Sequence, residues 1–154
     1  MENVLDVYKR PYDPPPPVVC FDAQSKQLVG EVATPIPAAP GPPERCDYEY
    51  VRNGTANLFM LNEPLAGQRH VSVTARRTKQ DFAKQMKMLV DELYPAVNRI
   101  TVVLDNLNTH RMSSLYEAFE PEEARRLMQK IQVVHTPKHG SWLNMAECEL
   151  RVMQ

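Results

Sequence analysis

ITVVLD at residues 100–105 and VVCFD at residues 18–22 are short apolar runs that each end in an aspartate. Short runs rich in β-branched residues predict strands that are buried on both faces, as in parallel sheets. In open α/β sheets, ligands bind beyond the carboxyl ends of the strands. Asp22 and Asp105 are therefore expected to lie where a ligand binds. Taken singly, each aspartate is equally well explained as a turn or helix-capping residue.

A third acid follows the last predicted strand. Residues 136–147 read TPKHGSWLNMAE, which indicates a strand end, a turn and a helix that carries Glu147. If this helix packs against the sheet, the carboxylates of Asp22, Asp105 and Glu147 converge, and such like charges need a cation to neutralise them. The pattern therefore predicts a metal site. Helical periodicity alone does not separate Glu147 from Glu149, because both flank the apolar stripe of the helix.

The composition is typical of one intracellular domain. The 154 residues are 43% hydrophobic. No apolar run approaches the roughly 20 residues of a membrane span, and the first residues do not resemble a signal peptide. The cysteines at positions 20, 46 and 148 are odd in number and far apart, so neither a disulfide framework nor a CxxC zinc site is indicated.

The charge balance gives the chain no general affinity for DNA. Its net charge is −1, whereas nonspecific DNA binding comes from Lys and Arg that neutralise phosphates. Any such binding must come from local clusters at residues 76–79, 125–126 and 138–139. The pair at residues 125–126 is better explained as part of a solvated helix face.

Two proline-rich segments divide the chain. Residues 11–17 are expected to be an arm that leads into the first strand, and residues 35–43 a long connection between strands. Turns are expected at residues 23–26 and at Asn53-Gly54. Besides residues 18–22, the expected strands are residues 27–32, 55–61, 70–74, 100–104 and 131–135.

Helical periodicity begins after Thr78, a predicted N-cap with Asp81 three residues later, and Pro95 is expected to end this helix. Further helices are expected at residues 113–119 and 122–130, and Ser141 is expected to cap a closing helix. Successive strands followed by strand–helix alternation predict an α/β fold with a mixed sheet flanked by helices. No GxGxxG motif follows a strand, which argues against a Rossmann domain.

Three segments carry a family resemblance. Residues 20–28, residues 103–110 (VLDNLNTH) and residues 136–147 strongly resemble the DDE catalytic domain of IS630 family transposases, within the wider Tc1/mariner group. The resemblance covers nearly the whole chain from Tyr8 onward. It implies an RNase H-like fold, with a mixed five-stranded sheet flanked by helices.

The same resemblance assigns Asp22, Asp105 and Glu147 as the catalytic triad and as the ligands of two Mg²⁺ or Mn²⁺ ions. It implies metal-dependent cutting of DNA at transposon ends by water. Strand transfer of the exposed 3′-hydroxyl into target DNA, usually at TA, follows in this family. The resemblance further implies a homo-oligomer in the full-length enzyme, a cytoplasmic and nucleoid-associated location, and no membrane.

Four residues beside these acids are expected to bind DNA. Asn106 and His110 follow the second acid, and Lys138 and His139 precede the third, where a cation would meet phosphate. Trp142 is expected to anchor the final helix in the core rather than to stack on a base.

The chain departs from the family pattern at Ala23, where members usually carry an acid directly after the first aspartate. Nothing before Tyr8 resembles the helix-turn-helix domains of the family, and the closing helix stops at Gln154. We therefore expect residues 1–17 to be an arm and residues 18–154 to be a catalytic domain truncated at its C-terminus. Two alternatives stay open: a catalytically inactive remnant that acts at most as an interaction module, and an RNase H-like nuclease that does not transpose.

Overall fold

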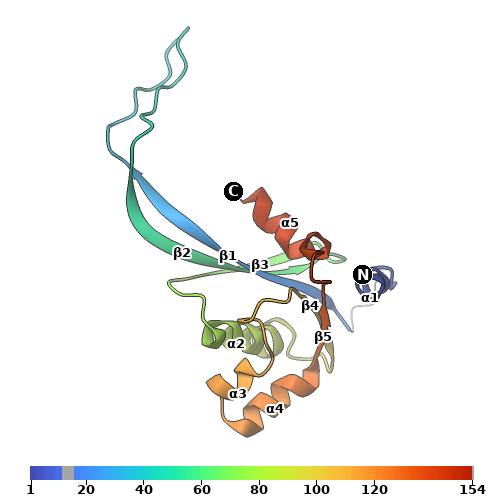
Figure 1. The fold of residues 1–154 in the computed structure, drawn as a ribbon. Helices are drawn as coiled ribbons and strands as arrows, with labels where there is room; N and C mark the ends of the chain where they lie inside the picture. Colours follow the sequence, from blue (N-terminus) through green and yellow to red (C-terminus); the bar gives the residue numbers. More distant parts are fainter. Residues whose placement is uncertain (12–15, 154) are drawn as a thin grey trace.

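A five-stranded mixed sheet forms the centre of the molecule (Figure 1). The structure is a computed structural model, and it describes residues 1–11 and 16–153. The sheet has the order β3-β2-β1-β4-β5 and consists of β1 Val18–Glu31, β2 Tyr50–Glu63, β3 Gln68–Thr74, β4 Ile100–Leu104 and β5 Ile131–His135. The pairs β1–β2 and β2–β3 are antiparallel, whereas β4 pairs parallel with both β1 and β5. The mixed α/β sheet expected from the sequence is confirmed.

Helices cover both faces of this sheet (Figure 1). One face packs against α2 Lys79–Met88, its π-helical continuation η1 Leu89–Leu93, α3 Ser114–Ala118 and α4 Pro121–Lys130. The other face packs against α1 Glu2–Tyr8, the 3₁₀ turn η2 Ser141–Leu143 and α5 Met145–Val152. Because β4 contributes side chains to both hydrophobic clusters, all of its residues are buried. This burial accounts for its uninterrupted apolar sequence.

Local signals place several helix ends where the sequence predicted them. The side chain of Thr78 accepts a hydrogen bond from the Asp81 backbone N–H, and the Thr78 backbone N–H donates one to the Asp81 carboxylate, which forms a capping box. The helical segment ends at Leu93, before Pro95. The prediction that Ser141 caps the closing helix was wrong. Ser141 begins η2, and Asn144 caps α5 through a 3.2 Å hydrogen bond from Ala146 N.

The first two strands are longer than predicted, and this corrects two turn predictions. β1 continues through residues 23–26, so Asp22 lies inside a strand rather than at its end. β2 runs through Asn53-Gly54, which meets an irregularity in the ladder between Gln27 and Val29 of β1, with Gly54 at a φ of +97°. A bulge, rather than a hairpin turn, uses the conformational freedom of this glycine.

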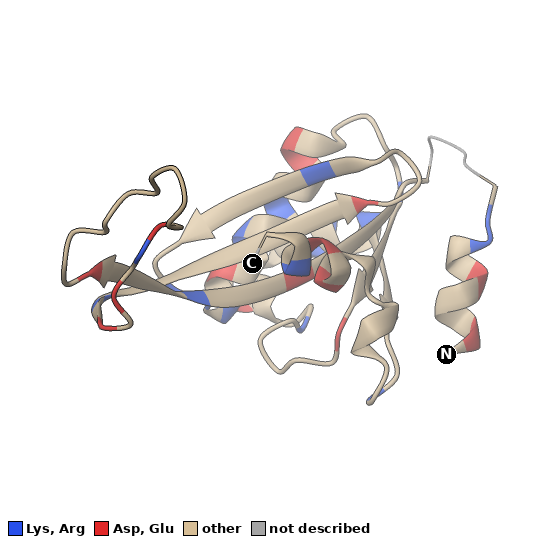
Figure 2. Ribbon diagram, turned by 90° about the horizontal axis from the view of Figure 1, so that it is seen from above, with Lys and Arg blue, Asp and Glu red and all other residues tan. Residues whose placement is uncertain are grey.

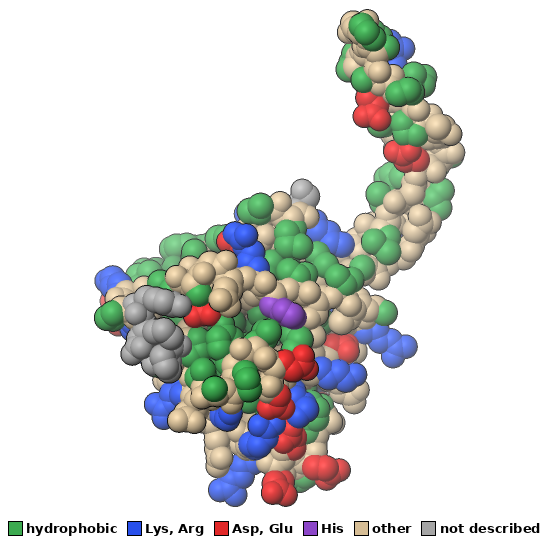
Figure 3. All heavy atoms as spheres, turned by 180° about the vertical axis from the view of Figure 1, so that it is seen from behind, with side chains coloured by type: hydrophobic (Ala, Val, Ile, Leu, Met, Phe, Trp, Pro, Cys, Tyr) green, Lys and Arg blue, Asp and Glu red, His purple; other side chains and the backbone are tan. Residues whose placement is uncertain are grey.

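The proline-rich residues 35–43 lie in the connection between β1 and β2, as expected. A single bridge from Ile36 to Arg45 crosses this connection. The distal parts of β1 and β2 form a ribbon that projects from the body (Figures 1 and 3). Prolines in the connection remove backbone donors, which favours an irregular path over further pairing.

The N-terminal segment begins with α1, whose Val4 and Val7 are buried against the sheet. Residues 12–15 of the expected arm lie outside the described residues. Cys20 is buried, Cys46 and Cys148 are exposed, and all three are free thiols. Within residues 1–11 and 16–153, no helix has the length and apolar character to cross a bilayer.

Candidate active site

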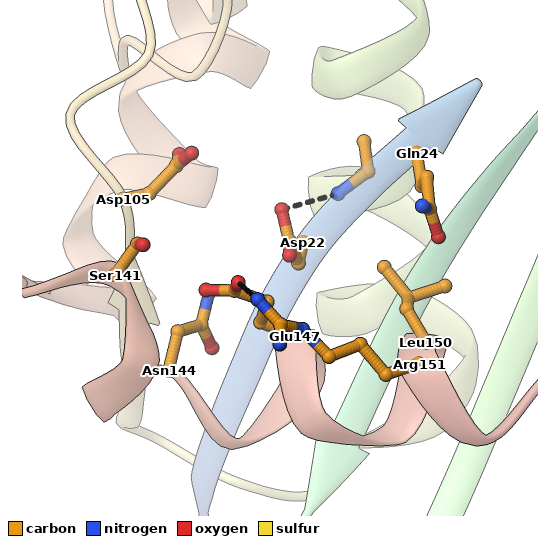
Figure 4. A pocket seen from close by; sticks show the side chains of 9 residues that line it. Asp22, Gln24, Asp105, Ser141, Asn144, Glu147, Leu150 and Arg151 are labelled. Carbon is orange, nitrogen blue, oxygen red and sulfur yellow. Dashed lines mark hydrogen bonds and ion pairs between the residues drawn. The ribbon is translucent and has the colours of Figure 1, made fainter.

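The three acids singled out from the sequence line one cavity of about 510 Å³ (Figure 4). Asp22 is the fifth residue of β1, Asp105 directly follows β4, and Glu147 lies in the first turn of α5. The parallel pairing of β1 with β4 brings the first two acids to neighbouring strands. The remaining lining residues are Ala23, Gln24, Ser141, Asn144, Leu150 and Arg151.

Asp22 is partly buried in the cavity. Burial raises the pKa of Asp22 to about 6, and the nearby carboxylates of Asp105 and Glu147 add to the increase. The Ala23 backbone N–H donates to Asp22 Oδ1 at 2.8 Å and opposes this increase. The cavity therefore destabilises negative charge on Asp22, as expected where acids converge without a cation.

A buried histidine forms a hydrogen bond with Asp105. His110 Nδ1 lies 2.6 Å from Asp105 Oδ1, and a carboxylate only accepts, so Nδ1 carries the shared proton. The imidazole is stacked on Phe82 and packs edge-on against Phe21, with centroid distances of 5.4 and 5.0 Å. His110 is 1% exposed. A side chain buried in this way does not contact DNA, so the expected DNA-binding role does not fit His110, which positions Asp105 instead.

The two glutamates of α5 have different surroundings. Glu147 lines the cavity and accepts a 2.9 Å hydrogen bond from Arg151 Nη2, one helical turn later. Glu149 instead pairs with Arg69 of β3. The structure thus distinguishes the two acids that periodicity left equivalent.

The carboxylates share a cavity without forming a joint ligand set. Among the described residues, no three His, Cys, Asp or Glu side chains lie close enough to hold one metal ion. The oxygen donors of the cavity fit a hard divalent cation by type. Asp105 and Glu147 are, however, engaged by His110 and Arg151, so the side chains must rearrange for them to bind one ion together.

The family model for DDE superfamily endonucleases matches residues 17–154. The chain belongs to this family. No curated protein matches the chain at a significant level. Membership supports a nuclease or transposase type of function on DNA, and domains of this superfamily depend on divalent metal ions.

Three further residues expected to bind DNA do not line the cavity of this endonuclease domain. Lys138 and His139 are exposed on the turn between β5 and η2. Asn106 is exposed, and its Nδ2 donates to the Thr136 carbonyl at 2.6 Å. This bond ties the second residue after β4 to the first residue after β5. Elsewhere, acidic and basic residues are interspersed along the elements (Figure 2).

Sequence reasoning missed Asn144, which joins two acid-bearing segments of the endonuclease domain. Asn144 is 1% exposed, and its Nδ2 donates to the Phe21 carbonyl, next to Asp22, at 2.8 Å. Its Oδ1 caps the helix that carries Glu147. An asparagine three residues before the acid is a usual N-cap signal, but Ser141 offered a competing one. Arg151 was also missed, although its i,i+4 spacing from Glu147 suggests an ion pair.

Proposed function

We propose that this chain is the catalytic domain of an IS630-type DDE transposase, which cuts DNA phosphodiester bonds and transfers a strand to target DNA. Asp22, Asp105 and Glu147 are its catalytic acids. The observation that carries the proposal is that these acids, from three separate segments of a DDE superfamily chain, line one cavity. Residues 18–154 are the catalytic unit in this proposal.

The three acids are also the proposed ligands of two Mg²⁺ or Mn²⁺ ions. Such ions supply a nucleophile at neutral pH and stabilise the leaving oxygen. The chain supplies the geometry: β1 and α5 are joined by Asn144, and His110 fixes the orientation of Asp105. The raised pKa of Asp22 supports the assignment, because a cation would relieve the repulsion that contributes to it.

DNA is the proposed partner in two forms, transposon ends and a target cut at TA. Lys138, His139 and Asn106 are the proposed phosphate or sugar contacts, since all three are exposed and lie next to segments that bear the acids. A homo-oligomer of the full-length enzyme is part of this proposal.

Cleavage of a labelled duplex in Mn²⁺ tests the proposal. We expect Asp22→Asn, Asp105→Ala and Glu147→Gln each to lower cleavage by about 100-fold or more, because even residues that only orient metal ligands cost 10–100-fold. Glu149→Gln is the matched control, since it removes the same charge from the same helix outside the cavity. If Glu147→Gln cuts as fast as wild type, or if Glu149→Gln loses activity equally, the triad assignment is wrong.

A nuclease without strand transfer is distinguished by its products. A donor 3′ end covalently joined to target DNA demonstrates transposase chemistry, whereas cut but unjoined products support a simple nuclease. A folded but inactive domain is the remaining candidate, favoured by the absence of a joint ligand set among the described residues. Isothermal titration with Mn²⁺ distinguishes this inactive domain from an active enzyme, because an inactive remnant of this kind binds no metal at the cavity.

A further inference from the structure

Trp142 is an exposed aromatic residue that directly follows Ser141, a lining residue of the candidate active site. The sequence predicted a core anchor, and this prediction was wrong, because Trp142 is 63% exposed. Leu143 is the anchor instead: it is 5% exposed, and its carbonyl accepts a 2.8 Å hydrogen bond from Tyr8 Oη. The largest apolar side chain of this segment therefore faces solvent.

The turn around Trp142 fixes where its indole lies. Ser141 lines the cavity and Leu143 points into the core, and successive side chains of a 3₁₀ turn are about 120° apart. Trp142 thus projects in a third direction, one residue from the cavity lining. The preceding turn is tightly packed, since a Cβ on Gly140 would lie 2.9 Å from the Pro137 ring. A closely packed segment therefore presents the indole to solvent, one residue along the chain from the cavity lining.

The surroundings of Trp142 favour a nucleobase as its partner. The exposed Lys138 and His139 of the same loop suit phosphates, whereas a neutral indole carries no charge and offers a phosphate only its one N–H donor. A large flat ring instead stacks on a base. Bases inside a duplex are already stacked on their neighbours, so only an unpaired base is free to stack on the indole.

We propose that Trp142 is a stacking platform for an unpaired nucleobase beside the phosphodiester bond at the cavity. The inference rests on the proposed function only in that DNA reaches this cavity. It predicts that the domain prefers DNA whose strands are separated near the cut, such as a fork, over a fully paired duplex. Stacking on one aromatic side chain changes affinity by roughly 5- to 100-fold.

Trp142 also provides its own assay, because it is the single tryptophan of the chain. The wild-type chain is titrated in Ca²⁺, which is used to hold the DNA uncut, with a forked oligonucleotide and with a fully paired duplex of the same sequence. We expect the fork to quench tryptophan emission strongly and the duplex to quench it little. Failure of the wild type to bind the fork, or equal quenching by both DNAs, would overturn the inference.

Variants at the same position, read by anisotropy of labelled DNA, complete the test. We expect Trp142→Ala to weaken fork binding by roughly 5- to 100-fold and to leave duplex binding unchanged, while Trp142→Phe retains most of the fork affinity. Because the side chain is exposed, circular dichroism should show an unchanged fold. If wild type and Trp142→Ala bind the fork equally while cleavage still depends on the three acids, the role of Trp142 is refuted and the proposed function is not. An emission shift that grows with protein concentration without DNA would instead assign Trp142 to a contact between copies.

Discussion

Replacing Asp22 by asparagine should stabilise the metal-free protein at neutral pH. In the folded state the pKa of Asp22 is about 6, against an ordinary value of 3.8, chiefly because the carboxyl is buried. A group whose folded pKa is raised binds more protons in the folded than in the unfolded state between these two values. The wild type therefore loses stability as the pH rises from about 4 to about 6, and stays at this lower level above it. Asparagine keeps the acceptor for the Ala23 N–H but carries no charge.

The size of this effect follows from the pKa difference. A difference of about 2 corresponds to roughly 3 kcal/mol at neutral pH. The cavity opens to water, which screens the charges, so we expect Asp22→Asn to raise the free energy of unfolding by about 1–2 kcal/mol at pH 7.5. At pH 4 the two proteins should be nearly equal, because the wild-type carboxyl is then largely protonated.

Urea unfolding followed by far-UV circular dichroism measures this difference at several pH values. The same unfolding experiment with Mn²⁺ is a second test. A cation at ten times its dissociation constant stabilises the wild type by about 1.4 kcal/mol. Asp22→Asn should gain much less, so saturating metal should narrow or reverse the order of stability. An Asp22→Asn protein that is no more stable at pH 7.5, or a stability difference that is the same at pH 4, would refute this account of the cavity.

Three further predictions concern the residues that support the acids. Thr78→Ala should cost about 1 kcal/mol of stability in urea unfolding, as loss of an N-cap does. Asn144→Ala should cost about 2–4 kcal/mol, because it also leaves the buried Phe21 carbonyl without its hydrogen bond, and only this change should weaken Mn²⁺ binding in calorimetry. Arg151→Ala should tighten Mn²⁺ binding by about twofold, since the exposed i,i+4 ion pair of Arg151 with Glu147 is worth a few tenths of a kcal/mol. Weaker Mn²⁺ binding by this variant would show that Arg151 does not compete with the metal for Glu147. His110→Phe should preserve the aromatic packing yet weaken Mn²⁺ binding by about 10- to 100-fold through loss of the hydrogen bond to Asp105, which calorimetry checks.

The sequence predicted elements well where local signals decide the structure. β4 and β5 begin and end where the apolar runs do, and the capping box at Thr78 was recognised from two residues. Such features depend on neighbours within a few positions. The convergence of the acids on one cavity was predicted correctly, although β1 continues past Asp22. The parallel pairing of β1 with β4 ends at Cys20 and Val103, and Asp22 and Asp105 each lie two residues beyond it.

Predictions failed where a distant segment decides the structure. Asn53-Gly54 has the composition of a hairpin turn, but pairing with β1 continues past it. Ser141 and Asn144 are both good N-caps, and Asn144 caps α5 while its side chain also reaches the Phe21 carbonyl across the core. His110 has the sequence context of a DNA contact, but the Phe21 and Phe82 rings enclose it. None of these partners is visible in local sequence.

Long-range hydrogen bonds fix the backbone of the site, whereas the side chains of the acids are free to rearrange. Asn144 fixes α5 to β1, and Asn106 fixes the segment after β4 to the end of β5, so the backbone around the acids is held by buried or short hydrogen bonds. The carboxylates themselves stand apart, because like charges repel and each has an alternative partner. A cation that binds here needs to exchange only side-chain contacts, chiefly that of Arg151 with Glu147. Metal binding should therefore change side-chain rotamers and leave the sheet and α5 where they are.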